Sequence, residues 1–261
     1  MNLKYYQVDA FTSQQFKGNP AGVIFSDISD TVLMQKIAFE NNLSEPAFIS
    51  EIDNEFYIRW FTPYCEVDLC GHATLASAFI FFNYIDSNKD TFKANSKSGE
   101  LRVTKNSSMY YLDFPIDELN EYKNMKLIEE VFNEKPEAIL MGRHDILAIF
   151  KNENTIKNLK PNFSLMCDID VRGFIASAEG NDVDFVSRCF FPITGINEDP
   201  VTGSAHTTLI PYWFNRLNKN NMMAKQLSER GGLLDCSIKD DRVFIGGQAV
   251  LYFSGTIEIK S

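Results

Sequence analysis

Two short segments of the chain share one pattern of residue types that could do chemistry. Residues 67–74 read VDLCGHAT, and residues 199–206 read DPVTGSAH. Each segment has an acidic residue, then a glycine followed by a polar residue and alanine, and each leads into an apolar run. Aligning Cys70 with Thr202 brings the two glycines into register. The pattern indicates that one structural device is built twice in this chain.

The glycine in each segment predicts a sharp turn that opens a helix. Glycine permits a backbone conformation in which a side chain would clash. The helix that follows begins with N–H groups that have no partner inside the helix, and this end favours negative charge. Such an end is suited to a carboxylate. We therefore expect a small anionic substrate at these turns. The binding residues would be Gly71, Ala73, Gly203 and Ser204.

Glu45 is a carboxylate whose neighbours could suit acid–base chemistry. It lies in the sequence LSEPAF, between apolar neighbours. A glutamate without such a context is most often a solvated loop residue. Burial disfavours the charged form of a carboxylate and raises its pKa. A raised pKa near the working pH suits a group that takes and returns a proton in turn.

His72 and Asp199 are the other candidate catalytic residues. An imidazole at the start of a helix is disfavoured from charging, so it could donate or accept a proton from the neutral form. Asp199 would by default cap the helix that follows it. Paired with His72 across a cleft, it could instead hold the imidazole in one tautomer. Asn19 could contact the polar end of the substrate.

Cys70 has two interpretations, and a metal site is a third alternative. A thiol at a helix N-terminus tends toward a lower pKa, so Cys70 either reacts or lines the pocket. Cys65, Cys70 and His72 do not have the spacing of a standard zinc site, and no second Cys or His pair completes four ligands. The glycines match neither the P-loop nor the dinucleotide pattern. We therefore expect no metal and no cofactor.

Composition narrows the class of protein. The 261 residues are 44% hydrophobic and carry a net charge of −10. This charge disfavours nucleic acid, whose backbone requires Lys and Arg patches, and anionic membrane surfaces. No apolar run approaches the roughly 18 residues that span a bilayer, and no signal-peptide region is visible. Five scattered cysteines suit a reducing compartment. We expect a cytoplasmic protein.

Periodicity predicts many short strands and about one buried helix in each half. A cap at Ser29 or Asp30 starts a helix through about Asn41, and a hairpin turns at Asp53 and Asn54. The other expected helices are 74–85, 126–132 and 205–215. The expected strands are 5–11, 21–25, 47–52, 56–61, 101–103, 110–114, 138–141, 146–150, 171–177, 185–191, 228–234, 238–245 and 249–259. Turns are expected at residues 231–232 and 246–247.

This order predicts a mixed α+β fold that is repeated. The boundary is expected near residues 115–120. The two domains would then be residues 1–116 and 117–250, with a C-terminal strand at about 250–261 available to complete the first.

The chain resembles the phenazine-biosynthesis (PhzF-like) isomerases, which are relatives of diaminopimelate epimerase. The matching blocks are DAF at 9–11, FKGNPA at 16–21, LSEPAF at 43–48, RWFTP at 59–63, EVDLCGHATLA at 66–76, EDPVTGSAH at 198–206, RGG at 230–232 and GGQAV at 246–250. The resemblance implies two similar domains, each a curved mixed or antiparallel β-sheet wrapped around a central α-helix. It also implies an active site in the cleft between the domains.

The resemblance further implies roles for single residues. Glu45 would shuttle the proton, and His72, Asp199 and Ser204 would lie beside the substrate. In the related epimerases each repeat supplies a thiol, one on each face of the substrate carbon. Here Thr202 stands at the second position, and a hydroxyl has too high a pKa to serve as the matched base. A two-thiol racemase is therefore not expected.

We thus expect a cofactor-independent isomerase that moves a proton between carbons of a small carboxylate, with Glu45 as acid and base. One alternative is an amino-acid racemase or epimerase that uses Glu45 or Cys70 opposite another base. Another is a non-catalytic small-molecule-binding protein on the same fold. Homodimers are common among the relatives, and no stretch of this sequence proves one. We do not expect the protein to bind nucleic acid or a membrane.

Overall fold

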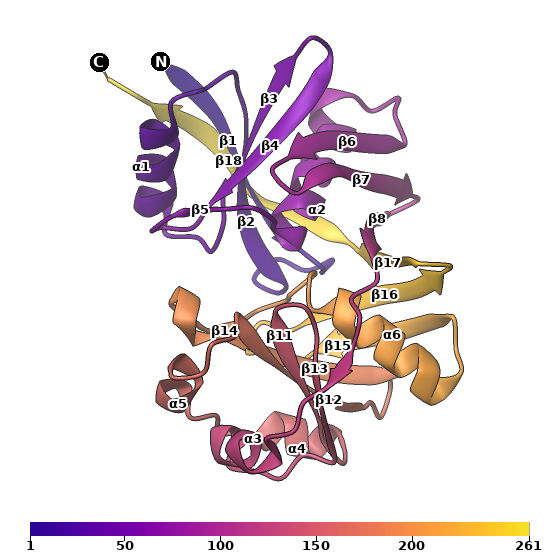
Figure 1. The fold of residues 1–261 in the computed structure, drawn as a ribbon. Coiled ribbons are helices and arrows are strands. Elements are labelled where there is room, and N and C mark those ends of the chain that lie inside the picture. The colour runs from indigo at the N-terminus through magenta and orange to yellow at the C-terminus, as the bar shows by residue number, and fades with distance from the viewer. Residues whose placement is uncertain (261) are drawn as a thin grey trace. The chain divides into compact units, whose positions relative to one another are not determined.

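A computed structural model of the protein describes residues 1–260, and the chain divides into two compact units (Figure 1). Unit 1 is Met1–Asp113 together with the segment from Gly246 onward, and unit 2 is Phe114–Ile245. The sequence predicts these two changes of domain at residue 116 and at about residue 250. The last strand, β18 (Ala249–Glu258), belongs to unit 1.

Unit 1 wraps its strands around one buried helix, α2 (Gly71–Ile80). Nine of the ten residues of α2 are buried. The helix packs against strands β1, β2, β3, β7 and β18, as Figure 1 shows. A helix that is apolar on all sides is stable only when it is enclosed in this way. The strands and helices of the unit are β1 (Asn2–Ala10), β2 (Asn19–Phe25), α1 (Thr31–Asn41), β3 (Ala47–Ile52), β4 (Glu55–Phe61), β5 (Glu66–Val67), α2, a π-helical turn (Phe81–Ile85), β6 (Thr91–Ser96), β7 (Gly99–Asn106), β8 (Met109–Pro115) and β18.

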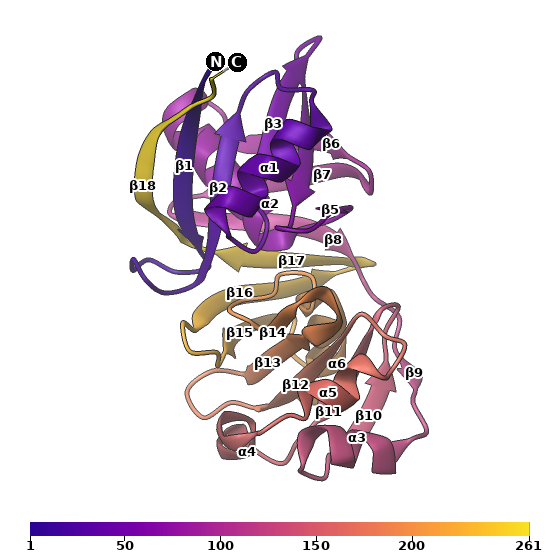
Figure 2. The ribbon, with the colours of Figure 1, turned by 90° about the vertical axis from the view of Figure 1, so that its left-hand side faces the viewer.

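The sheet of unit 1 is mixed. Strand β1 pairs antiparallel with both β18 and β2, β2 pairs parallel with β3, and β3 pairs antiparallel with β4. Figure 2 shows β1 and β18 side by side, with the two ends of the chain next to each other. There the N–H of Ile259 donates to the carbonyl of Met1 at 2.8 Å. The C-terminal strand therefore completes the sheet that the N-terminal strand begins.

Local signals in unit 1 produce the expected structures. The Asp30 carboxylate accepts hydrogen bonds from the N–H groups of Val32 and Leu33 and so caps α1. The β3–β4 hairpin turns at Asp53 and Asn54, whose φ angles are 53° and 64°. Both residues are in the left-handed region that this tight turn requires. These two predictions are confirmed.

Replacing Asp30 with Ala should destabilise unit 1 by about 1 kcal/mol, because two N–H groups at the start of α1 lose their acceptor. Chemical denaturation followed by circular dichroism measures the change in the free energy of unfolding. Asp27→Ala is the matched control, since Asp27 is exposed and lies outside the helix. An equal loss in both variants would contradict the capping role.

The strands of unit 2 also pair in both directions, and its longest helix is the half-buried α6 (His206–Leu217). Trp213 of α6 stacks on Phe185 with ring centroids 5.7 Å apart, and its indole N–H donates to the Ser177 hydroxyl at 2.9 Å. The helix is therefore fixed against the sheet by one polar and one aromatic contact. The other elements are β9 (Asn120–Glu121), α3 (Met125–Phe132), β10 (Ala138–Met141), β11 (Asp145–Ile149), α4 (Glu153–Asn158), α5 (Phe163–Cys167), β12 (Gly173–Glu179), β13 (Phe185–Phe191), a 3₁₀ turn (Pro192–Thr194), β14 (Ile196–Asp199), β15 (Asn221–Gln226), β16 (Gly232–Lys239) and β17 (Arg242–Gly247).

The α+β class is confirmed. Several elements differ from the prediction. Residues 228–231 form a turn instead of a strand, because the Gly231 N–H donates to the Ser228 hydroxyl and Gly231 has a φ of +67°. Helix α2 begins three residues before its predicted start. Strands β6 and β15 and helices α4 and α5 were not predicted.

Gly246 and Gly247 lie in strand β17 and not in a turn. A side chain at Gly247 would come within 2.4 Å of the Phe11 ring, so this glycine serves close packing. Over residues 1–260, the helices all fall short of the length and apolarity that crossing a membrane demands.

Candidate active site

The first elbow, residues 70–74, is the turn that leads into α2. Cys70 is the last extended residue before the helix, with φ −144° and ψ 111°. Its carbonyl accepts a hydrogen bond from the Thr74 N–H at 3.2 Å and another from the Thr74 hydroxyl. The Cys70 thiol lies 3.4 Å from Nδ1 of His72. The elbow thus holds a thiol and an imidazole in contact.

Glu45 reaches the first elbow from the loop between α1 and β3. A hydrogen bond ties this loop to the end of β4: the N–H of Phe61 donates to the carbonyl of Pro46 at 3.2 Å. The Oε2 atom of Glu45 lies 3.6 Å from Nε2 of His72 and 3.8 Å from Sγ of Cys70. The side chain is 17% exposed. The structure therefore brings Glu45, Cys70 and His72 into one cluster, which we call the Glu–Cys–His cluster.

His72 is neutral in this cluster. Burial lowers the pKa of its imidazole to about 3, because a charged ring would lose its hydration. The contact between His72 and Glu45 is therefore not an ion pair at ordinary pH. A neutral imidazole has one N–H donor and one acceptor nitrogen, so it can bridge a thiol and a carboxylate.

The second elbow, residues 199–206, connects β14 to α6. The Thr202 hydroxyl donates a short hydrogen bond to Oδ2 of Asp199. Gln226, fully buried at the end of β15, accepts the Thr202 N–H at 2.9 Å and donates to the Asp199 carbonyl at 2.7 Å. The Gln226 side chain therefore fixes the backbone of the second elbow to the end of β15 through two hydrogen bonds.

The thiol nearest the second elbow is an inert one. Cys189 of β13 donates to Oε1 of Gln226 at 3.7 Å and is completely buried. Burial raises the pKa of this thiol well above its usual value. At the position that matches Cys70, Thr202 commits its hydroxyl proton to Asp199. The second elbow therefore lacks the thiol chemistry of the first, and its helix starts later: α2 begins at the glycine itself, whereas α6 begins three residues after Gly203.

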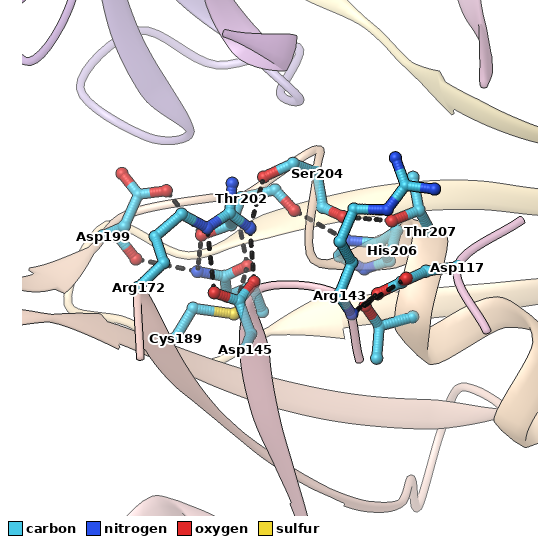
Figure 3. Close-up of polar contacts among 12 residues, drawn as sticks. Asp117, Arg143, Asp145, Arg172, Cys189, Asp199, Thr202, Ser204, His206 and Thr207 are labelled. Atoms are coloured by element: carbon cyan, nitrogen blue, oxygen red, sulfur yellow. Dashed lines mark hydrogen bonds and ion pairs between the residues drawn. The ribbon is translucent and has the colours of Figure 1, made fainter. Parts of the chain in front are cut away.

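Arg172 brings a positive charge to the second elbow. Its guanidinium makes a two-point ion pair with Asp145, in which Nε lies 2.9 Å from Oδ1 and Nη2 contacts Oδ2. Nη2 also lies 3.5 Å from the Ser204 hydroxyl, and the guanidinium carbon is 5.6 Å from the centre of the Phe191 ring. Figure 3 shows Asp145 and Ser204 on either side of this guanidinium. Asp145 is 2% exposed and the Arg172 side chain 37%, so the carboxylate is covered and the guanidinium still reaches solvent.

His206 serves the fold of the second elbow. Its Nδ1 lies 2.8 Å from the Thr202 carbonyl, and the residue has no exposed surface. Its Nε2 is buried and has no hydrogen-bond partner among the described residues. Burial lowers the pKa of the imidazole to about 4, although the bond to Thr202 opposes this shift.

The pKa of His206 predicts a loss of stability in mild acid. The unfolded chain protonates this residue near pH 6.5 and the folded chain only near pH 4, so the unfolded state binds more protons in between. Stability should be fully present above pH 6.5 and fall by about 3 kcal/mol as the pH drops to 4. His206→Asn keeps a donor for the Thr202 carbonyl and should remove this part of the pH dependence.

The measurement is the free energy of unfolding at several pH values between 7 and 4. His144 is exposed, so His144→Asn is the matched control and should follow the wild-type curve. Parallel curves for the wild type and His206→Asn would show that the His206 prediction is wrong.

The structure distributes the predicted site residues over the two units. Unit 1 holds Asn19, Glu45, Cys70, Gly71, His72 and Ala73, and unit 2 holds Asp199, Gly203 and Ser204. Asn19 is fully buried at the start of β2. Asp199 accepts a bond from Thr202 in its own unit, so its expected pairing with His72 stays a prediction.

Sequence reasoning missed Arg172, Asp145 and Gln226. Asp145 and Arg172 meet because β11 and β12 run parallel and Asp145 lies opposite Gly173. Parallel pairing joins strands that are distant in the sequence, so no local pattern announces it. The one available signal was a charged residue directly before an apolar run, at residues 172–178.

Comparison with known proteins assigns relatives to nearly the whole chain. Residues 8–255 match the family model described as phenazine biosynthesis-like protein. An uncharacterized isomerase of Pseudomonas aeruginosa is 44% identical over 100% of both chains. A crystal structure of a PhzF family protein from Enterococcus faecalis has a TM-score of 0.96 and 46% identity, covering 99% of this chain and 100% of that one.

A more distant likeness concerns the fold alone. A hydroxyproline epimerase from Agrobacterium vitis has a TM-score of 0.65 at 8% identity, and the match covers 98% of this chain and 92% of that one. The fold is therefore shared beyond the phenazine biosynthesis-like relatives.

Proposed function

The chain belongs to the phenazine biosynthesis-like (PhzC-PhzF) family, and from this we propose that it is an isomerase that moves a proton between two carbons of a small carboxylate substrate. Glu45 is the acid and base in this proposal. The observation that carries it is the position of the Glu45 carboxylate, 17% exposed and 3.6 Å from the buried, neutral His72 imidazole. The reaction needs no cofactor.

In the proposed reaction one carboxyl group, that of Glu45, both removes the proton and returns it. The Glu45 carboxylate takes a proton from a carbon next to an unsaturated system, and the electron pair of that C–H bond enters the system. The double bond shifts by one position. The protonated Glu45 then returns the proton to the carbon at the other end, on the same face. Nothing is oxidised or reduced, and the carboxylate is regenerated.

His72 and Cys70 would orient Glu45 in this reaction. An Nε2–H of His72 points its donor toward Oε2 of Glu45, and Nδ1 can then accept from the Cys70 thiol. The 3.6 Å separation of Nε2 and Oε2 is longer than a hydrogen bond. Catalytic contacts of this kind often shorten only when the substrate is bound. A neutral imidazole can also stabilise charge that develops on the substrate.

Unit 2 holds groups that suit a carboxylate. Gly203 and Ser204 offer backbone N–H groups, and Arg172 offers a guanidinium that Asp145 already orients. Hydrogen bonds between charged groups contribute roughly 1.5–3 kcal/mol each. Asp199 would accept a hydrogen bond from a polar group of the substrate.

A racemase or epimerase is the second candidate, and the contact between Cys70 and Glu45 favours it. Such an enzyme needs a second base on the opposite face of the carbon. At the position of that second base stands Thr202, and a hydroxyl has too high a pKa to serve as a matched base, even with its proton donated to Asp199. This is why we favour the isomerase.

A ligand screen followed by proton exchange separates the candidates. Small unsaturated carboxylates are tested for thermal stabilisation of the wild-type protein, and those that bind are incubated in D₂O. An isomerase changes the ultraviolet spectrum of the ligand as the double bond moves. A racemase places deuterium on Cα of both enantiomers without that change. A ligand that stabilises the protein but exchanges no proton would favour a non-catalytic binding protein.

A further inference from the structure

The Glu–Cys–His cluster gathers three side chains that could hold a metal ion. Its three donor atoms lie within 4.8 Å of one another. The separations are 3.6 Å for His72 Nε2 to Glu45 Oε2, 3.8 Å for Cys70 Sγ to the same oxygen, and 4.0 Å for Sγ to Nε2. A cation at the centre of such a triangle lies about 2.2 Å from each atom, in the plane of the three, and zinc bonds to sulfur, nitrogen and oxygen measure roughly 2.0–2.3 Å. Cys70 Sγ lies nearer to Nδ1 of His72, at 3.4 Å, than to Nε2, so the ring must turn and the three donor atoms must draw slightly together to form a tetrahedral site with Nε2 as the ligand.

We propose that Glu45, Cys70 and His72 bind one thiophilic divalent cation, Zn²⁺, and that the bound ion blocks the enzyme. Three protein ligands leave a fourth position of the tetrahedron for water or for the carboxylate of a substrate. The Cys70 thiol gives up its proton to solvent when the ion binds. The predicted inhibition rests on the proposed function, because a Glu45 carboxylate that is bound to the ion can no longer take a proton from the substrate.

The donor set selects the ion. A thiolate and an imidazole are poor ligands for Mg²⁺ and Ca²⁺, which prefer oxygen, and good ligands for Zn²⁺. Cys70 and His72 are buried with relative exposures of 6% and 4%. Glu45 is the most exposed of the three ligands, so the ion would enter past its carboxylate.

The sequence argued against a metal because the cysteine and histidine spacing is not that of a standard zinc site. That argument considered only residues near one another in the chain. The fold adds Glu45, which approaches Cys70 from the loop before β3. A carboxylate is a common third ligand where zinc keeps an open position.

Cobalt(II) is the probe, because tetrahedral Co²⁺ with a thiolate ligand gives a charge-transfer band in the near ultraviolet. The metal-free protein is titrated with Co²⁺, and the ion is then displaced with Zn²⁺. The wild type should bind one ion per chain with this band. Cys70→Ser should lose the band and bind Zn²⁺ at least roughly 100-fold more weakly, because even residues that only support a ligand are worth 10–100-fold.

Cys65→Ser is the matched control, since Cys65 is an exposed free thiol of the same unit. It should keep the band and the affinity. Glu45→Gln should keep the band, since the thiolate remains, and should bind more weakly. Loss of the band in Cys65→Ser, or equal affinity in the wild type and Cys70→Ser, would overturn the site.

Inhibition is measured separately on the exchange reaction in D₂O. Zn²⁺ should stop exchange in the wild type, and a chelator should restore it. If proton exchange continues when Zn²⁺ fills the site, the predicted inhibition is wrong, although the metal site itself is still supported. A wild type that never exchanges protons but shows the cobalt band would count against the proposed function alone.

Discussion

Replacing Glu45 with Gln should lower turnover roughly 10²- to 10⁴-fold, the range that general acid–base groups contribute. The amide has nearly the shape of the carboxylate but cannot take up a proton from carbon. The fold should persist, since Glu45 lies in a loop outside the core strands. Substrate affinity should change little, because glutamine keeps the size and hydrogen-bonding shape of glutamate. Turnover and ligand affinity, measured side by side, separate these effects.

Glu51→Gln is the control for this prediction. Glu51 lies six positions further along the chain and is exposed on β3, so the same chemical change there should leave turnover intact. Wild-type turnover in Glu45→Gln would remove Glu45 from the mechanism. Equal losses in both variants would point to a general effect of charge.

Replacing Arg172 with Gln should have the second largest effect, on both stability and binding. Asp145 is 2% exposed, and without Arg172 its carboxylate is left buried and unpaired. Removing one partner of a buried pair costs about 3–5 kcal/mol, and we expect the lower value because Arg172 is partly exposed. The affinity for a carboxylate ligand should also fall, roughly 10- to 100-fold, through the loss of a charge-assisted hydrogen bond.

A second variant separates the two effects of Arg172. Combining Arg172→Gln with Asp145→Asn removes both charges, so most of the lost stability should return. The ligand affinity should stay low, because the guanidinium is still missing. Arg102→Gln is the matched control, since Arg102 and Glu100 form an exposed pair on β7 that should contribute little. If the double variant binds ligand as the wild type does, Arg172 has a structural role only.

The sequence predicted features whose signals are local. Asp30 caps α1 because an aspartate before a helical run can reach two N–H groups of the next turn. Asp53 and Asn54 turn the hairpin because both tolerate a positive φ. Gly247 was misjudged for the same reason, since a glycine that permits close packing against Phe11 looks the same in sequence as one that permits a turn.

The candidate site could be predicted only in part. Glu45 and His72 were selected through family resemblance, and their contact depends on how the loop before β3 meets the start of α2. Arg172 and Asp145 were missed because their contact arises from the parallel pairing of β11 with β12. The proposed metal site depends on the same kind of contact, since Glu45 is far from Cys70 in the sequence. Contacts between distant segments are what the fold adds.

Transfer of a deuterium label within one substrate molecule tests most directly whether Glu45 carries the proton. A carboxylate ligand that the enzyme turns over is labelled with deuterium at the carbon that loses its proton, and the product is examined by NMR after a single turnover in H₂O. A single carboxyl group that takes and returns the proton should deliver part of the label to the accepting carbon, and Glu45→Gln should abolish this transfer. Label transfer at an unchanged rate in Glu45→Gln would contradict the account.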